Sequence, residues 1–208
     1  MRLSGGEHLA VRADADVVAF LVIPIGFRAS LGVVVGSSER QPRYAAGVVV
    51  VLIGAAGAGK TTIGRELAGA IGCRFVDGDD LHPPESIAKM RAGTGLTDVD
   101  RAPWLAALHR AIAGALDRRE VLVVACSALK QQYRDALRGD LRHIRFVYLK
   151  APEGLLRHRL TERPGHFAGP ALLASQLAAL EEPEDGLTLD AGEPPERTVG
   201  AIRYEFGL

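Results

Sequence analysis

Two short stretches of the chain contain residues whose types and spacing could do chemistry. The first, Gly54-Ala55-Ala56-Gly57-Ala58-Gly59-Lys60-Thr61, matches the pattern G-x-x-x-x-G-K-[ST]. Its near-absence of side chains would let backbone N–H groups close around phosphate oxygens. Lys60 would then reach the β- and γ-phosphates, and the Thr61 hydroxyl would bind Mg²⁺. The stretch therefore predicts a phosphate loop, whereas a Gly/Ala turn that matches by chance is the alternative. The predicted cofactor-binding residues are Gly54, Ala55, Ala56, Gly57, Ala58, Gly59, Lys60, Thr61 and Thr62.

The second stretch, DGDDLHPPESIAKM at 77–90, is unusually acidic at its start. Asp77 and Asp79 lie two apart at the end of an apolar run, so we expect them to share one face of a strand, with Asp80 turned away. Two carboxylates about 5 Å apart repel each other by roughly 3 kcal/mol at an effective dielectric constant near 20. A divalent cation on nucleotide phosphates would remove this cost, and a substrate hydroxyl could use the second carboxylate. The stretch therefore predicts one wall of a cleft that faces the phosphate loop. A solvated acidic turn is the alternative, and it stays open for Asp80.

Other polar residues nearby have less specific signals. His82 and two prolines would fix a turn that brings Lys89 back over the cleft. A lone histidine is more often structural than catalytic. Asp98 and Asp100 precede a helical pattern, and helix capping explains them as well as a role in a site does.

The elements that must position these residues follow from the hydrophobic pattern. Continuous β-branched and aliphatic runs predict buried strands at 48–53, 73–76, 121–125, 144–149 and 187–189. Helical spacing predicts a helix at 60–71 and another that Asp100 caps. Strands that alternate with helices indicate an α/β fold, a three-layer α/β/α arrangement around a parallel sheet of about five strands. Ligands of such sheets bind beyond the carboxyl ends of the strands, where both stretches fall.

Composition narrows the class of protein. The chain has 208 residues with 25 basic and 25 acidic side chains, a balance that argues against a nucleic-acid partner. Residues 1–46 carry no recognisable chemistry. Their apolar run at 17–23 is too short to span a membrane, and Asp14 and Asp16 precede it where a secretory signal has basic residues. A poorly ordered tail, an added hairpin and a start site assigned too early all fit this extension. Cys73 and Cys126 in apolar surroundings indicate buried thiols and a cytoplasmic location.

Four strings after the phosphate loop carry a family resemblance. DGDDLHPPESIAKM, DRAPWLAAL, CSALKQQYRDALR and RPGHF occur in this order. Together they resemble the gluconate kinase (gluconokinase) family, small P-loop kinases of the shikimate kinase and adenylate kinase type. The resemblance covers about 48–206, so we expect a kinase domain at 47–208 with a helical lid at 153–183. It implies ATP- and Mg²⁺-dependent phosphorylation of D-gluconate to 6-phospho-D-gluconate, no membrane partner, and a homodimer. Another small sugar-acid or polyol kinase and an ATP sensor without turnover are the alternatives.

The resemblance also implies roles for single residues. Asp77 would help to hold magnesium through water, together with Thr61, and Asp79 would orient the accepting hydroxyl. The adenine would rest on the loop at 190–195. The implied catalytic residues are Lys60, Asp79, Arg159 and Arg163. The implied substrate-binding residues are Asp79, His82, Lys89, Ser127, Lys130, Arg134 and His166. The chain departs from the family pattern in its phosphate loop, where Ala56 and Ala58 replace serines.

Overall fold

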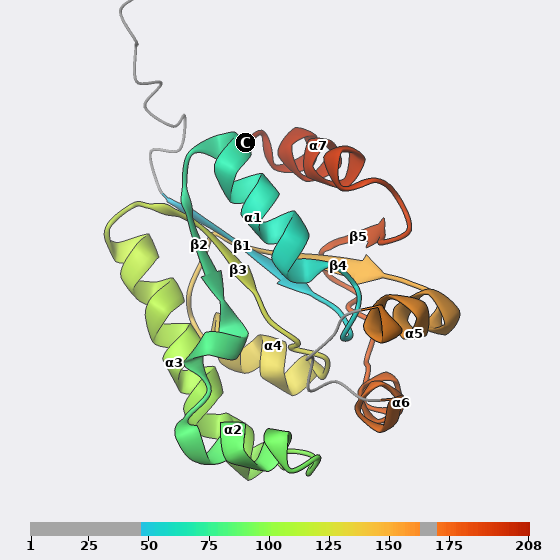
Figure 1. The fold of residues 1–208 in the computed structure, drawn as a ribbon. Coiled ribbons are helices and arrows are strands. Elements are labelled where there is room, and N and C mark those ends of the chain that lie inside the picture. The colour runs from blue at the N-terminus through green and yellow to red at the C-terminus, as the bar shows by residue number, and fades with distance from the viewer. Residues whose placement is uncertain (1–46, 163–169) are drawn as a thin grey trace, which may run out of the picture. The chain divides into compact units, whose positions relative to one another are not determined.

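The computed structural model describes residues 47–162 and 170–208, and these form an α/β structure around one parallel sheet (Figure 1). The N-terminal extension at 1–46 and residues 163–169 lie outside the described residues. The second of these ranges includes Arg163 and His166, which the resemblance assigns to the site. The sheet has five strands in the order β2-β3-β1-β4-β5, and all pairs are parallel. The strands are β1 (Val48–Ile53), β2 (Arg74–Asp77), β3 (Val121–Ala125), β4 (Ile144–Lys150) and β5 (Leu187–Asp190).

The helices of the described ranges alternate with these strands, as the sequence predicts. A short 3₁₀ helix, η1 (Gly78–Leu81), follows β2 directly. The α-helices are α1 (Lys60–Ile71), α2 (Pro84–Arg91), α3 (Asp98–Asp117), α4 (Gln131–Arg138), α5 (Glu153–Thr161), α6 (Pro170–Ala178) and α7 (Pro195–Phe206). None of them is both long and apolar enough to cross a lipid bilayer.

The central strand β1 is apolar on both faces because helices cover both. Val49, Val51 and Ile53 point into a core cluster formed with α3 and α4. Val50 and Leu52 point into a second cluster formed with α1, α5, α6 and α7. The three-layer prediction is thus confirmed, and the carboxyl ends of the strands are left to carry a site.

The start of α3 differs from the sequence prediction. The helix begins at Asp98 and its cap is Thr97, whose hydroxyl accepts a hydrogen bond from the Asp100 amide at 3.2 Å. The Asp100 carboxylate accepts one in return from the Thr97 amide at 3.0 Å. Asp100 is therefore the third residue of a capping box and not the cap itself.

The two cysteines are free thiols, Cys126 buried and Cys73 half-buried. Burial raises the pKa of Cys126 to about 12 and that of Cys73 to about 11. Both thiols are therefore protonated at neutral pH.

Trp104 of α3 holds the turn that follows β2. Its indole Nε1 donates a hydrogen bond to the Gly78 carbonyl at 2.7 Å, and the whole side chain is buried. The His82 ring stacks on the indole with centroids 4.5 Å apart and planes 7° apart. Burial, and then the nearby Arg101 charge, lowers the pKa of His82 to about 4. His82 is consequently a neutral ring at neutral pH, and α3 and the turn form one packed unit.

The lowered pKa of His82 predicts a pH dependence of stability. Between about pH 6.5 and 4 the imidazole is protonated in the unfolded chain but stays neutral in the folded chain. The free energy of unfolding should therefore fall as pH decreases through this window, by on the order of 2 kcal/mol. Urea unfolding at several pH values measures this slope. His82→Phe keeps a ring against Trp104 and should remove most of the slope. An equal slope in both proteins would contradict the burial of a neutral imidazole.

Candidate active site at the carboxyl edge of the sheet

The predicted phosphate loop connects β1 to α1. Gly57 and Gly59 have φ angles of 84° and 87°, in the left-handed region that favours glycine. A Cβ at Gly57 would also lie 2.9 Å from the Leu156 carbonyl oxygen of α5. No described side chain caps α1, so its first N–H groups remain for an anion. The conformation fits a phosphate-binding loop.

The side chains of Lys60 and Thr61 contact different parts of the site. The Lys60 ammonium donates hydrogen bonds to the carbonyl oxygens of Gly54 at 2.9 Å and Ala55 at 3.0 Å, so it lies over the loop. The Thr61 hydroxyl donates to Oδ2 of Asp77 at 2.9 Å. Asp77 therefore faces the phosphate loop, as the cleft interpretation requires. Thr62, also predicted to bind the cofactor, is exposed on α1.

The acidic turn does not continue the strand as the sequence predicts. Asp77 is the last residue of β2, and the chain turns into η1 at Gly78, so strand alternation does not place Asp79. Instead the Asp79 amide donates to Oδ1 of Asp77 at 3.2 Å, and the Asp79 side chain is exposed. The charges of Lys60, Asp77 and Asp79 all act on the Cys126 thiol at the end of β3. These three side chains therefore lie near the carboxyl end of β3.

A metal ion fits the Thr61–Asp77 pair. Hydroxyl and carboxylate oxygens are the donors that Mg²⁺ prefers, and a Mg²⁺ ion shared with phosphates needs only one or two protein ligands. Within residues 47–162 and 170–208 no three His, Cys, Asp or Glu side chains gather into a metal site made by protein alone. The donor set therefore suits a nucleotide-borne cation.

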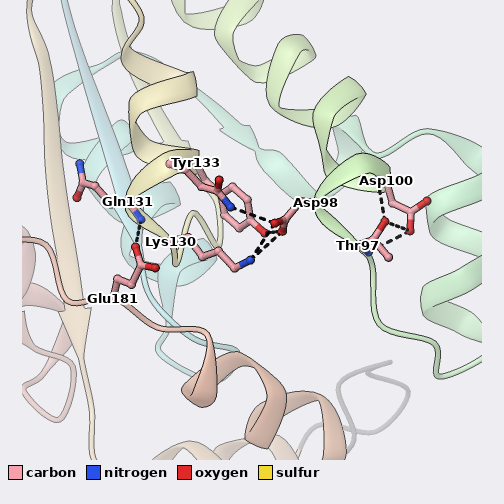
Figure 2. Close-up of polar contacts among 8 residues, drawn as sticks. Thr97, Asp98, Asp100, Lys130, Gln131, Tyr133 and Glu181 are labelled. Atoms are coloured by element: carbon pink, nitrogen blue, oxygen red, sulfur yellow. Dashed lines mark hydrogen bonds and ion pairs between the residues drawn. The ribbon is translucent and has the colours of Figure 1, made fainter.

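The two lysines predicted to bind substrate are held by acidic residues at the start of α3. Lys130 donates to both carboxylate oxygens of Asp98, at 2.8 and 3.1 Å, and the Tyr133 hydroxyl donates to the same carboxylate (Figure 2). Lys89 of α2 forms an ion pair with Asp100 at 2.6 Å. The start of the helix therefore both caps α3 and fixes two basic side chains.

These contacts lower the pKa of both carboxyl groups to about 2. The hydrogen bond from Lys130 is the main cause at Asp98, and the hydrogen bond from Lys89 is the main cause at Asp100. Since the folded pKa lies below the ordinary value of 3.8, the two pairs stabilise the fold above about pH 4 and lose this contribution as pH falls toward 2.

Arg134 takes a different place from the one the family resemblance implied. It is only 1% exposed, and its guanidinium donates to the carbonyls of Ala128 at 3.2 Å and Leu129 at 3.0 Å. It also donates to the Gln131 side chain at 2.6 and 3.2 Å. Arg134 therefore supports the loop that contains Ser127, and its predicted contact with a substrate carboxylate stays a prediction. Ser127 itself is half-buried just beyond β3.

Arg159 of α5 lies against the phosphate loop. Its guanidinium donates to the Gly57 carbonyl at 3.4 Å and to the Ala191 carbonyl, beyond β5, at 2.8 Å. It thus joins the loop to the turn that the resemblance assigns to adenine.

Sequence reasoning missed Gln176 of α6. Its side-chain oxygen Oε1 accepts a hydrogen bond from the Ala56 amide at 2.7 Å, although the two residues are 120 positions apart. A single glutamine on an apolar helix gives no pattern that would single it out.

Comparisons with known proteins agree with this geometry. The AAA domain family matches residues 49–183. A gluconokinase of Gluconobacter oxydans is 47% identical over 145 residues, which cover 70% of this chain and 79% of the relative. The thermoresistant gluconokinase of Escherichia coli is 39% identical over 157 residues, covering 74% and 90%.

Solved structures give the same result. The structure of a gluconokinase from Sinorhizobium meliloti is 39% identical with a TM-score of 0.62, covering 77% of this chain and 97% of that one. A sugar kinase from Janibacter is 40% identical with a TM-score of 0.71, covering 76% and 93%. The APS kinase of Mycobacterium tuberculosis, at 17% identity and a TM-score of 0.59, shares the fold. With its phosphate loop, its acidic turn and these relatives, the chain belongs to the gluconokinase family of P-loop kinases.

Proposed function

We propose that this protein transfers the γ-phosphoryl group of ATP to the terminal hydroxyl of D-gluconate, giving 6-phospho-D-gluconate and ADP. The observation that carries the proposal is the 2.9 Å hydrogen bond between Thr61 and Asp77. It joins the nucleotide loop to the acidic turn, so that both border one cleft in a chain of the gluconokinase family. From the resemblance we retain a cytoplasmic homodimer without nucleic-acid or membrane partners as part of the proposal.

The nucleotide side of the cleft would work by positioning and charge. The Lys60 ammonium would move from the carbonyls of Gly54 and Ala55 to the β- and γ-phosphates, whose negatively charged oxygens attract an ammonium more strongly than neutral carbonyl oxygens do. Thr61, and Asp77 through water, would hold Mg²⁺, which neutralises charge on the phosphates when bound. Arg159 is close enough to the loop to stabilise the same charge. Arg163 is proposed for this role from the resemblance alone.

The acceptor side would orient one hydroxyl and bind one carboxylate. Asp79 would accept a hydrogen bond from the terminal hydroxyl of gluconate and so aim its oxygen at the γ-phosphorus. The neutral His82 ring has a buried Nδ1 without a hydrogen-bond partner among the described residues, which suits a second hydroxyl. Lys130 and Lys89, fixed by Asp98 and Asp100, would bind the acid. Ser127 and His166 complete the proposed set.

A panel of acceptors tests the substrate. With ATP and coupled detection of ADP, kcat/KM should be highest for gluconate and about a hundredfold lower for a neutral polyol, because the lysines would lose a charged partner. Lys60→Met is the inactive control. Preference for shikimate or for the polyol would overturn the choice of substrate. ATP binding without turnover of any acceptor would point to a nucleotide sensor.

The role of Asp79 is tested by removing its charge. Asp79→Asn should lower kcat by a factor of a hundred or more, on the order of 3 kcal/mol, and leave ATP affinity nearly unchanged, because the carboxylate acts on the acceptor. Steady-state kinetics and a nucleotide titration measure the two effects. Asp80→Asn, one position along the same exposed turn, is the matched control. A loss of ATP affinity with normal kcat would move Asp79 to the nucleotide side.

The carboxylate contact is tested at Lys130. Lys130→Met keeps the apolar stem and removes the ammonium, so KM for gluconate should rise about tenfold while KM for ATP stays constant. Lys150→Met removes another exposed lysine that is paired with an acidic residue, Glu182 at 2.8 Å, and serves as control. An unchanged KM for gluconate would place the acid elsewhere in the cleft.

A further inference from the structure

One contact in the nucleotide half of the cleft comes from α6, which no part of the proposed mechanism uses. The Ala56 amide donates to Oε1 of Gln176 at 2.7 Å, and both residues are half-buried. Because a backbone amide can only donate, the atom of Gln176 that faces it must be the side-chain oxygen. The contact therefore fixes which way the carboxamide points.

The same peptide group holds the lysine of the phosphate loop. The Ala55 carbonyl, on one side of the peptide bond, accepts a hydrogen bond from the Lys60 ammonium at 3.0 Å. The Ala56 N–H, on the other side, donates to Gln176. Hydrogen bonds at both ends of one peptide group polarise it and strengthen each other. Gln176 is thus connected to Lys60 through a single peptide unit.

The helix that carries Gln176 is itself anchored. Leu173 is fully buried in the core cluster of α1 and α7, and Leu177 packs against the same cluster. Just beyond α6, the Glu181 amide donates to the Leu129 carbonyl at 2.9 Å. The Glu181 carboxylate accepts a hydrogen bond from the backbone N–H of Gln131 at 2.5 Å, a contact drawn in Figure 2. The helix therefore spans from the phosphate loop to the loop beyond β3.

We propose that Gln176 is a positioning residue for the phosphate loop. By holding the 55–56 peptide it keeps the loop in its nucleotide-ready conformation and keeps the Lys60 ammonium directed over it. A loop that is already ordered loses less conformational freedom when a nucleotide binds, so affinity is higher. The inference rests on the proposed binding of ATP, and it concerns the nucleotide half of the cleft only.

Three variants separate this role from simple packing. Gln176→Met has similar length but no carbonyl acceptor, whereas Gln176→Glu keeps an acceptor oxygen. Ser175→Ala, at the exposed neighbouring position of α6, is the matched control. In the nucleotide-free protein, the amide exchange rate of Ala56 measured by NMR should rise at least tenfold in the Met variant and stay near the wild-type rate in the Glu variant and the control.

Nucleotide binding and steady-state kinetics then test whether the ordered loop raises nucleotide affinity. In the Met variant the Kd for ADP and the KM for ATP should each rise about tenfold, while the KM for gluconate and the melting temperature stay near their wild-type values. Unchanged Ala56 exchange, or ADP binding that becomes tighter, would overturn the proposal; the second result would mean that Gln176 competes with the nucleotide. A parallel rise in both KM values with a lower melting temperature would show a general packing role and would also overturn it.

The exchange measurement separates this inference from the proposed function. If the wild-type protein bound no adenine nucleotide, the proposed function would fail. The Ala56 exchange rates would still decide whether Gln176 holds the loop.

Discussion

The hydrogen bond between Thr61 and Asp77 is the contact on which the site depends, because it crosses the end of a strand. β3 lies between β1 and β2 in the sheet, so the loop after β1 and the turn after β2 are not neighbours through strand pairing. The 2.9 Å contact joins them above the end of β3, where the chain continues into Cys126. A small buried side chain at that point leaves room for the two loops to approach. The order of the strands thus brings the loop after β1 and the turn after β2 to the same end of β3, and the hydrogen bond joins them.

Much of this arrangement can be read from local sequence. The inner strands β1, β3 and β4 are largely apolar on consecutive positions because they are buried on both faces, and all five strands begin and end within one residue of the predicted bounds. Glycines at 57 and 59 are required by backbone angles that other residues rarely adopt, so the phosphate loop leaves a strong pattern. Features that a few adjacent residues determine are therefore predictable.

Other features depend on contacts that no local pattern records. Asp79 was placed by strand alternation, but the strand ends two residues earlier, because the Trp104 indole holds the turn at Gly78 from α3. The pairs Asp98–Lys130 and Ala56–Gln176 join positions 32 and 120 residues apart. The burial of Arg134 does have a local signal in the sequence. It lies three positions before Leu137, which places both on the buried face of α4.

The lysine of the phosphate loop and the lysines proposed for the acceptor side have different partners, and this bears on how each would bind a ligand. The lysine of the phosphate loop donates to neutral carbonyl oxygens, so a phosphate would replace weaker acceptors with stronger, charged ones. The lysines proposed for the acceptor side are paired with carboxylates, so under the proposed function a sugar acid would share them with Asp98 and Asp100. Part of the attraction for an anion is thereby cancelled in advance. Affinity on the nucleotide side would come from charge, whereas discrimination among different acids on the acceptor side would come from geometry, since only an acid that reaches both the lysines and Asp79 makes all the contacts.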